Sequence, residues 1–441
     1  MANIYFISLG CDKNRIDAEL MCERLISAGH NICTELEKCE AAVVNTCGFI
    51  ESAQKEAIDN IFDMARSKER GEIRALIVTG CLAQRYGRQL REQLPEVDAA
   101  LGLAYNTEIA DAVERALAGE RFERFGRPEE LIINGQRALS TPQHYAYIKL
   151  AEGCSNHCTY CAIPSIRGRF RSRPMEEIIS EARGLAERGV RELIAVAQDT
   201  TSYGSDLYGK PELAALLKRL CDEKLFWRIR LLYAYPERIN GELIELLAAE
   251  RGIAAYFDIP LQHASAEVLK RMGRSGSGED YLRLIERLRY ALPEISLRSS
   301  FIVGFPGETE AQFEELLAFI KSAKLERAGC FAFSAEEGTA AARLKGQLPE
   351  EIKLERTGRF NALRDELLHS AQREKVGGVF EAVCDGYDEE HGMFSLRGDS
   401  DAPEIDSCIY APLECDMMPG EIYRMKIIAA EGAELIGEPV Y

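Results

Sequence analysis

The sequence predicts an α/β protein in three parts: an N-terminal parallel α/β sheet domain at 1–118, a central partial (β/α) barrel at 144–370 and a small antiparallel β-barrel at 371–441. Strand and helix patterns alternate through the first two parts, which is typical of a parallel sheet with helices on its faces. Weak periodicity at 119–143 indicates a linker between them. In the last part, short strand patterns punctuated by glycine replace the helices, as in small antiparallel barrels.

The strand predictions rest on short runs rich in apolar and β-branched residues. In the first part these are Asn3–Leu9, Ala41–Asn45 and Arg74–Val78, separated by helical patterns such as Arg15–Ala28 and Glu51–Ser67. In the central part they are Ala146–Ala151, Glu192–Ala197, Arg228–Leu232, Ala255–Ile259, Ser296–Val303 and Gly329–Phe333, again with helical patterns between them. A long charged helix at about Pro349–Lys375 leads to tail strands at Val379–Cys384, Gly392–Leu396, Ser407–Tyr410, Tyr423–Ile428 and Glu434–Ile436.

The negative charge of the chain is concentrated in the tail. The whole chain carries a net charge of −18, and residues 371–441 contain 16 acidic but only 5 basic side chains. Because affinity for nucleic acid comes largely from neutralising phosphates, this composition disfavours a nucleic-acid substrate. It favours a basic protein as partner. The alternative is that the acidic tail serves solubility alone.

No segment predicts a membrane span or a secretion signal. No apolar stretch approaches the roughly 20 residues that a spanning helix needs, and the N-terminus MANIYFISLGC has no basic region and no cleavage site. We therefore expect a cytoplasmic protein with no membrane partner. Since that compartment keeps thiols reduced, the 14 cysteines indicate metal or redox chemistry rather than disulfides.

Three cysteines follow the three N-terminal strands. Cys11, Cys47 and Cys81 lie in FISLGC, VVNTC and LIVTGC. Because loops at the carboxyl ends of parallel strands gather at one edge of the sheet, these thiols are expected to converge. One such cysteine would suit ordinary packing, but three after three strands favour a metal cluster. The eight cysteines outside this group and the next are interpreted as small buried hydrophobes.

The second group, Cys154, Cys158 and Cys161, forms the C-x3-C-x2-C run AEGCSNHCTYC just after the first barrel strand. Three thiolates are too few for a structural zinc site, which needs four ligands. Iron–sulfur clusters are held by cysteine thiolates, and an iron without a protein ligand can bind a substrate atom. The alternative is zinc with His157 as fourth ligand, although its neighbour Cys158 would strain a shared tetrahedron.

This run, with Tyr160 before its last cysteine, resembles the fingerprint of the radical S-adenosylmethionine (SAM) enzymes. The resemblance implies a cluster on the three cysteines and SAM bound across the carboxyl ends of the barrel strands. It implies that reduction cleaves SAM and releases a 5′-deoxyadenosyl radical. It also implies that the backbone of Tyr160 meets the adenine.

Further SAM contacts are expected at the ends of the barrel strands, where barrel sites are built. Gln198 and Asp199 end the second strand, and Arg298 lies in the fifth, where a structural ion pair is the alternative. The four arginines in 167–173 form either a solvated loop or a group that meets acidic atoms of SAM or substrate. The glycine-rich segment 273–278 is interpreted as a substrate loop, since it lacks the preceding strand of a P-loop. The sequence assigns no catalytic residue.

The cysteine-bearing N-terminal unit, the radical SAM barrel and the small barrel tail together resemble the methylthiotransferases over the full length of the chain. The resemblance implies two [4Fe-4S] clusters facing one cavity and two SAM molecules, one as methyl donor and one as radical source. The N-terminal cluster would supply or carry the inserted sulfur, and the tail would be a TRAM domain. An electron donor and a sulfur donor are further expected partners.

Several segments resemble the methylthiotransferase branch that modifies an aspartate of small-subunit ribosomal protein S-twelve. They are IPSIRGRFRSRP (163–174), VAQDTTSYG (196–204), DIPLQHAS (258–265), RSSFIVGFPGET (298–309) and FSAEEGTAA (333–341). The resemblance implies methylthio insertion at the β-carbon of that aspartate, a carbon that no general base could deprotonate. The alternatives are a tRNA adenosine methylthiotransferase and, in another class, a non-enzymatic metal-binding assembly or electron-transfer protein.

Overall fold

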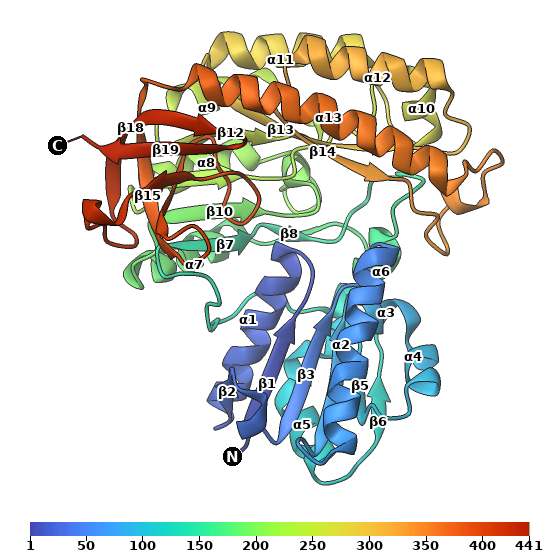
Figure 1. The fold of residues 1–441 in the computed structure, drawn as a ribbon. Helices are drawn as coiled ribbons and strands as arrows, with labels where there is room; N and C mark the ends of the chain where they lie inside the picture. Colours follow the sequence, from blue (N-terminus) through green and yellow to red (C-terminus); the bar gives the residue numbers. More distant parts are fainter. Residues whose placement is uncertain (441) are drawn as a thin grey trace.

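The computed structural model describes residues 1–440, which form two six-stranded sheets, a closed five-stranded barrel and a two-stranded ribbon (Figure 1). The N-terminal sheet is parallel with the order β2-β1-β3-β4-β5-β6. Its strands are β1 (Asn3–Ser8), β2 (Asn31–Cys33), β3 (Ala41–Thr46), β4 (Ala75–Gly80), β5 (Ala99–Leu101) and β6 (Phe122–Arg124). The three predicted strands are confirmed as β1, β3 and β4. The other three strands contain only three residues each, too few to show a period in the sequence.

Helices cover both faces of this sheet. They are α1 (Asp12–Ser27), η1 (Leu36–Lys38), α2 (Glu51–Glu69), α3 (Cys81–Tyr86), α4 (Arg88–Gln93), η2 (Leu103–Glu108) and α5 (Ile109–Leu117). Val43 and Ile77 pack toward α1 and α5, whereas Val44 and Val78 pack toward α2 and α3. Burial on both faces explains the unbroken apolar runs of β3 and β4.

The central sheet is also parallel and remains open, with the order β14-β13-β12-β11-β10-β7, so the predicted partial barrel is confirmed. Its strands are β7 (Tyr145–Lys149), β10 (Glu192–Val196), β11 (Arg228–Leu231), β12 (Ile253–Asp258), β13 (Ser296–Val303) and β14 (Arg327–Ala332); β8 (Ala151–Glu152) and β9 (Arg171–Ser172) form the ribbon. The α-helices are α6 (Ile163–Arg167), α7 (Met175–Glu187), α8 (Leu213–Asp222), α9 (Gly241–Ala249), α10 (Ala266–Arg271), α11 (Gly278–Ala291), α12 (Glu310–Ala323) and α13 (Glu350–Glu374). Among residues 1–440, no helix combines the length and apolarity needed to cross a membrane.

The two faces of the central sheet have different partners. One face packs on its own helices in the largest core of the protein. On the other face, Tyr147 and Tyr256 lie in a core that also contains Ile16 of α1 and Ala402 of the segment after β16. Figure 1 shows α1 below this sheet and the tail beside it. The N-terminal and C-terminal units therefore complete the core of the open barrel.

The tail forms a closed barrel with the order β15-β16-β17-β19-β18. Its strands are β15 (Val379–Asp388), β16 (Met393–Gly398), β17 (Ile409–Ala411), β18 (Ile422–Glu431) and β19 (Glu434–Pro439). The prediction of an antiparallel barrel needs one correction, because β17 and β19 pair in parallel while the other four pairs are antiparallel. The reason is geometric: five strands cannot alternate in direction all the way around a closed ring.

A buried ion network attaches the tail to the central sheet. Arg397 of β16 donates to Glu192 of β10 at 2.8 Å and to Asp385 of β15 at 2.5 Å. Arg230 of β11 also donates to Glu192, at 2.7 Å. Burial opposes ionisation of Glu192, yet the two arginines hold the pKa of this carboxyl below its ordinary value. The attachment therefore depends on complete charge pairing, since an unpaired buried charge is costly.

We predict that Arg397→Met lowers the free energy of unfolding by about 3–5 kcal/mol, because it removes the cation shared by Glu192 and Asp385 and leaves their buried charges incompletely paired. Urea denaturation of the full chain measures the change. The control is Arg183→Met, which removes an exposed ion pair with Glu223 and should cost less than about 1 kcal/mol. Equal effects of the two substitutions would contradict the structural role of Arg397.

Candidate functional site

The first cysteine group lies at the carboxyl ends of three neighbouring strands. Cys11 follows β1, Cys47 follows β3 and Cys81 follows β4, and these strands are adjacent in the sheet. The thiols lie close enough that Cys11 influences the ionisation of Cys47, and both influence that of Cys81. Gly10 makes this approach possible: its φ is +92°, and a Cβ there would come within 2.8 Å of the Cβ of Cys47. The structure thus brings the three side chains together, and we name them the N-terminal triad.

Burial differs among the three thiols. Cys11 is exposed, whereas Cys47 and Cys81 are buried. Burial raises the pKa of Cys47 and raises that of Cys81 to about 12. Both buried thiols are therefore protonated at neutral pH, and a metal that binds them must displace their protons.

The second group, named here the barrel triad, lies in the loop between β8 and α6. The Cys154 sulfur accepts a hydrogen bond from the backbone N–H of Asn156 at 3.4 Å, and the Cys158 sulfur lies 3.8 Å from the Tyr235 hydroxyl. Burial raises the pKa of Cys161 to about 12. All fourteen cysteines are free, so every thiol of both triads is available as a ligand.

The end of α10 and the start of the segment 273–278 support this loop. Thr159 donates from its backbone N–H to the carbonyl of Met272 at 2.9 Å, and from its hydroxyl to the carbonyl of Arg271 at 2.8 Å. A Cβ on Gly273 would come within 2.5 Å of the carbonyl oxygen of His157. The glycine-rich segment therefore begins with a close backbone contact to the loop that carries the barrel triad.

The loop that follows β11 lies beside both triads. In this loop Tyr235 approaches Cys158, while the hydroxyl of Tyr233 lies 3.4 Å from Asp12, the residue next to Cys11. Tyr233 has a φ of +62°, which is uncommon for a residue with a side chain and is held here by the surrounding contacts. On the other side, Cys81 packs in one small cluster with Ala162, the neighbour of Cys161. Cysteines far apart in the sequence thus border one region at the mouth of the open barrel.

Four buried charges lie beside this region and form a closed ring, named here the charge ring. Lys149 Nζ lies 2.6 Å from Asp17 Oδ1 and 2.6 Å from Glu152 Oε2. Arg167 Nη1 donates to the second oxygens of the same carboxylates, at 2.9 and 3.0 Å. Each side chain is at most 1% exposed. Burial opposes ionisation of Glu152, but Arg167 and Lys149 hold its pKa below the ordinary value.

Arg167 also connects the charge ring to the N-terminal triad. Its Nη2 donates to the sulfur of Cys81 at 3.3 Å and to the side-chain oxygen of Asn14 at 3.2 Å. The interpretation of 167–173 as a solvated loop is therefore wrong for Arg167 and for Arg173, which is buried in an ion pair with Glu181. The charges of these two arginines are paired within the protein, and the pairs join elements of the fold. The sequence offered one signal for such a network: Lys149 and Glu152 are charged residues within an apolar strand region.

Of the four expected SAM contacts, Gln198 and Asp199 follow β10, Tyr160 lies in the cysteine loop, and Arg298 lies within β13 beside the end of β12. Gln198 donates to Glu152 at 2.6 Å, and its own side-chain oxygen is buried without a hydrogen-bond partner. Asp199 is buried and accepts bonds from Asn156, Arg238, Thr201 and Ser202, so both its oxygens are occupied within the protein. Arg298 forms the alternative ion pair, with Asp258 at 3.1 Å. Tyr160 packs on the apolar cluster that contains Phe305 and Phe333.

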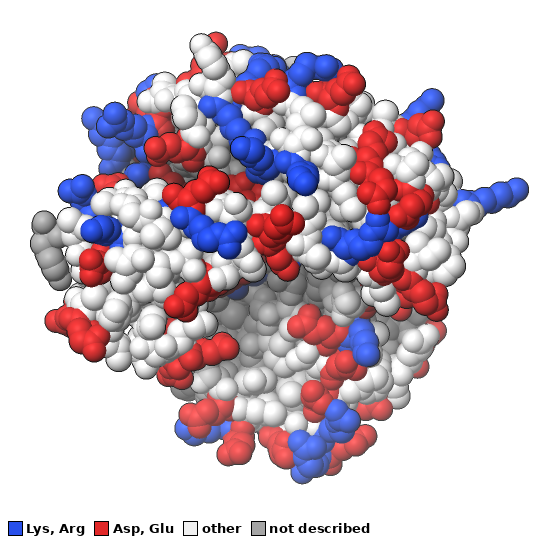
Figure 2. Space-filling model, turned by 45° about the horizontal axis from the view of Figure 1, so that its top comes forward, with Lys and Arg blue, Asp and Glu red and all other residues white. Residues whose placement is uncertain are grey.

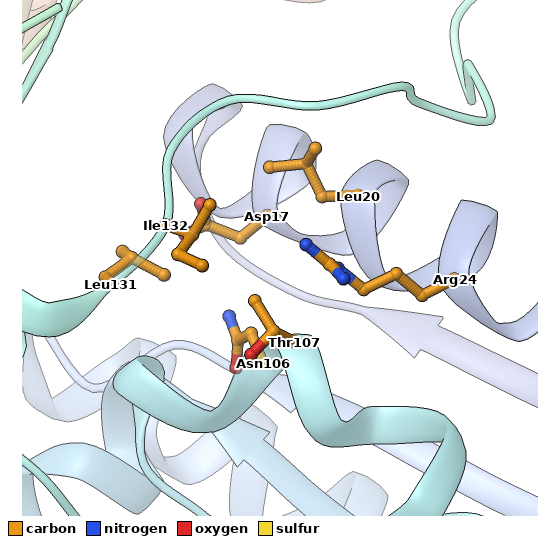
Figure 3. Close-up of a pocket in the computed structure, with 7 residues that line it drawn as sticks. All are labelled: Asp17, Leu20, Arg24, Asn106, Thr107, Leu131 and Ile132. Atoms are coloured by element: carbon orange, nitrogen blue, oxygen red, sulfur yellow. The ribbon is translucent and has the colours of Figure 1, made fainter.

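A small cavity lies next to Asp17, which forms part of its wall (Figure 3). It is lined by Leu20 and Arg24 of α1, by Asn106 and Thr107 of η2, and by Leu131 and Ile132 of the connection that follows. Its volume is about 10 Å³, the size of one water molecule. One nitrogen lining it, Nδ2 of Asn106, is buried without a partner, which suits a water rather than a cofactor.

Among the described residues 1–440, no three His, Cys, Asp or Glu side chains are grouped as ligands of a single metal ion. A [4Fe-4S] cluster needs a wider arrangement, because each thiolate binds a different iron. Two separate triads of free, neighbouring thiols fit that requirement in number and in donor chemistry.

Comparisons with known proteins agree with this geometry. Residues 148–320 match the radical SAM superfamily, residues 3–102 match the uncharacterized protein family UPF0004, and residues 376–440 match the TRAM domain. The fold is similar to the structure of the radical S-adenosylmethionine methyltransferase TsrM from Kitasatospora setae with cobalamin and a [4Fe-4S] cluster bound. The TM-score is 0.57 at 14% identity, over 75% of this chain and 74% of that one.

Full-length relatives include the ribosomal protein uS12 methylthiotransferases RimO of Pelotomaculum thermopropionicum, 47% identical over 99% of both chains, and of Desulforamulus reducens, 45% identical over 99% of both chains. The open parallel barrel with its C-x3-C-x2-C loop is that of a radical SAM enzyme, a class that uses SAM and a [4Fe-4S] cluster. Within that class, the chain belongs to the RimO family of methylthiotransferases.

We predict that iodoacetamide modifies Cys11 at least about tenfold faster than Cys81 in the metal-free protein near pH 8. Cys11 is exposed, while burial keeps the Cys81 thiol protonated until the pH approaches about 12. Mass spectrometry of timed digests measures both rates. The difference should disappear in urea. Equal rates in the folded protein would show that Cys81 is not shielded as described.

Proposed function

We propose that this chain inserts a methylthio group at the β-carbon of an aspartate of ribosomal protein uS12, using two [4Fe-4S] clusters and two SAM molecules. The names of its full-length relatives support the substrate and the reaction. The observation that carries the proposal is that one loop, the loop after β11, lies beside both triads: Tyr235 approaches Cys158, and Tyr233 approaches Asp12, the neighbour of Cys11. A reaction that joins a radical to a sulfur donor requires such a shared site.

In this proposal the barrel triad of Cys154, Cys158 and Cys161 holds one cluster and the N-terminal triad of Cys11, Cys47 and Cys81 holds the other. When bound, the first cluster with SAM supplies the carbon radical and the second supplies the sulfur that is inserted. Three cysteines per triad would leave one iron of each cluster without a protein ligand, and SAM or sulfur would bind at that position.

The chain's own polar groups prepare the site for SAM. We propose that Gln198 presents its unpartnered oxygen to a donor of SAM, since Glu152 fixes its amide nitrogen. The backbone of Tyr160 would meet the adenine. Asp199 would act as a positioning residue, because it holds Asn156 of the cysteine loop at 2.9 Å. Arg298 would reach a SAM carboxylate while it remains paired with Asp258.

Closure of the mouth excludes water from the radical. The charge ring, the Tyr233 ring under Lys13 Nζ at 3.2 Å, and the ion pair of Arg85 with Glu336 at 2.9 Å all join the N-terminal unit to the barrel. A dry site protects a reactive intermediate from side reactions. We propose a division of the chain into 1–118, a linker at 119–143, 144–370 and 371–441, which the three matched family segments support and in which β6 of the linker adds an edge strand to the N-terminal sheet.

The surface proposed to receive the ribosomal protein is acidic. Acidic side chains lie at several points around the hollow in the face shown in Figure 2. The tail contributes 16 acidic and 5 basic residues to the chain. Such a surface attracts a basic ribosomal protein and repels the phosphates of tRNA. A reducing electron donor and a sulfur donor complete the proposed set of partners.

The test is to incubate the reduced, iron-loaded protein with SAM and uS12, and separately with tRNA. We predict an increase of about 46 Da on one aspartate of uS12, the net gain when a methylthio group replaces one hydrogen, and no change in tRNA. Loading should give about eight irons per chain, from two four-iron clusters.

Two triple variants separate the parts of this reaction. Replacing Cys154, Cys158 and Cys161 by alanine should abolish both SAM cleavage and product. Replacing Cys11, Cys47 and Cys81 by alanine should abolish the product but retain formation of 5′-deoxyadenosine. Modification of tRNA instead of uS12, or full product from either triple variant, would contradict the proposal.

A further inference from the structure

One side chain contacts both halves of the proposed site. Arg167 is the last residue of α6, six positions after Cys161, and its guanidinium reaches the sulfur of Cys81 in the N-terminal unit. The guanidinium is 1% exposed. No other hydrogen bond among the described residues joins a triad sulfur to a cationic side chain.

The position of the guanidinium is fixed from several sides. Asp17 and Glu152 accept from Nη1, and Asn14 accepts one hydrogen of Nη2. Asn14 is itself held, since its amide donates to the carbonyls of Leu9 at 2.6 Å and of Thr46 at 3.3 Å. Because these contacts fix the guanidinium, the remaining hydrogen of Nη2 points at the sulfur of Cys81.

The charge ring is neutral without any contribution from cysteine. Two cations, Lys149 and Arg167, face two anions, Asp17 and Glu152. The Nη2 group of Arg167 is nevertheless turned toward the N-terminal triad and lies 3.3 Å from the sulfur of Cys81. A thiolate at Cys81 is thus met by a charge-assisted donor in a site closed to water.

We infer that Arg167 is a positioning residue that donates a hydrogen bond to the Cys81 sulfur while it ligates the N-terminal cluster, and thereby raises the reduction potential of that cluster. This inference rests on the proposed function, in which Cys81 is a ligand. Hydrogen bonds to ligand sulfurs and nearby charge are among the factors that set cluster potentials. Because Arg167 belongs to the barrel, it also couples the state of the N-terminal cluster to the docking of the two units.

Arg137 serves as a control that distinguishes a hydrogen bond to sulfur from a purely structural ion pair. Arg137 is 4% exposed and pairs with Glu19 of α1 at 2.7 Å, just as Arg167 pairs with Asp17 of α1. It also pairs with Glu181. The hydrogen bonds of Arg137 go to Glu19 and to the carbonyl of Tyr147, and none goes to a cysteine. Substitution of Arg137 therefore tests the loss of a buried brace without the loss of a sulfur contact.

The experiment uses the full chain with Cys154, Cys158 and Cys161 replaced by alanine, so that only the N-terminal cluster is present. Redox titration followed by electron paramagnetic resonance measures its potential. In Arg167→Gln we expect the ratio of reduced to oxidised cluster at a fixed applied potential to fall about tenfold, or about 59 mV for a one-electron couple. Arg167→Lys should retain part of the effect, and Arg137→Gln should leave the ratio unchanged.

Two additions keep the test decisive if Arg167→Gln does not fold. Arg167→Gln with Glu152→Gln keeps the ring neutral, and the same fall in the ratio is expected. In the chain with unmodified Arg167, labelling arginine with nitrogen-15 should produce a nitrogen coupling in the pulsed spectrum of the cluster, absent from Arg167→Lys.

An unchanged ratio in the loaded variants, or no arginine coupling in the parent chain, would overturn the inference. Failure of the parent chain to load about four irons on Cys11, Cys47 and Cys81 would instead overturn the proposed function. The iron content of the parent therefore distinguishes the two failures.

Discussion

The arrangement of this protein depends on four charges buried between two units of the fold. Lys149 and Glu152 come from the barrel, Asp17 comes from the N-terminal unit, and Arg167 closes the ring beside Cys81. Burying charges costs several kcal/mol for each ion, and only complete pairing offsets that cost. The ring therefore forms only when α1 and α6 are placed correctly, and this requirement specifies how the N-terminal unit sits on the barrel.

The same placement explains why one loop, the loop after β11, lies beside both cysteine triads. The parallel sheet of the N-terminal unit brings Cys11, Cys47 and Cys81 to its carboxyl edge, and the loop after β8 carries the other three. Docking through α1 then turns that edge toward the carboxyl ends of the barrel strands. The tail completes the arrangement, because its Ala402 segment fills the same core as α1. Residues of all three units thus share one core beside the central sheet.

Much of the fold and of the candidate site was predictable from the sequence, for physical reasons that differ from element to element. The strands β3 and β4 are buried on both faces, so their apolar runs are unbroken, and the cysteines that follow them were expected to converge. Short strands such as β5 show no period and escape detection. The parallel pairing of β17 with β19 follows from closing five strands, which periodicity cannot reveal. The charge ring joins residues up to 150 positions apart, and no local pattern encodes such a contact.

We propose that two iron–sulfur clusters face one chamber, and their magnetic interaction tests this arrangement most directly. Electron paramagnetic resonance of the fully reduced, loaded chain should differ from the sum of the spectra of the two triple cysteine variants, each of which retains one cluster. Faster relaxation and broadening that depend on both triads are expected, because unpaired electrons at close range couple. A spectrum equal to that sum, with unchanged relaxation, would show that the clusters lie in separate sites.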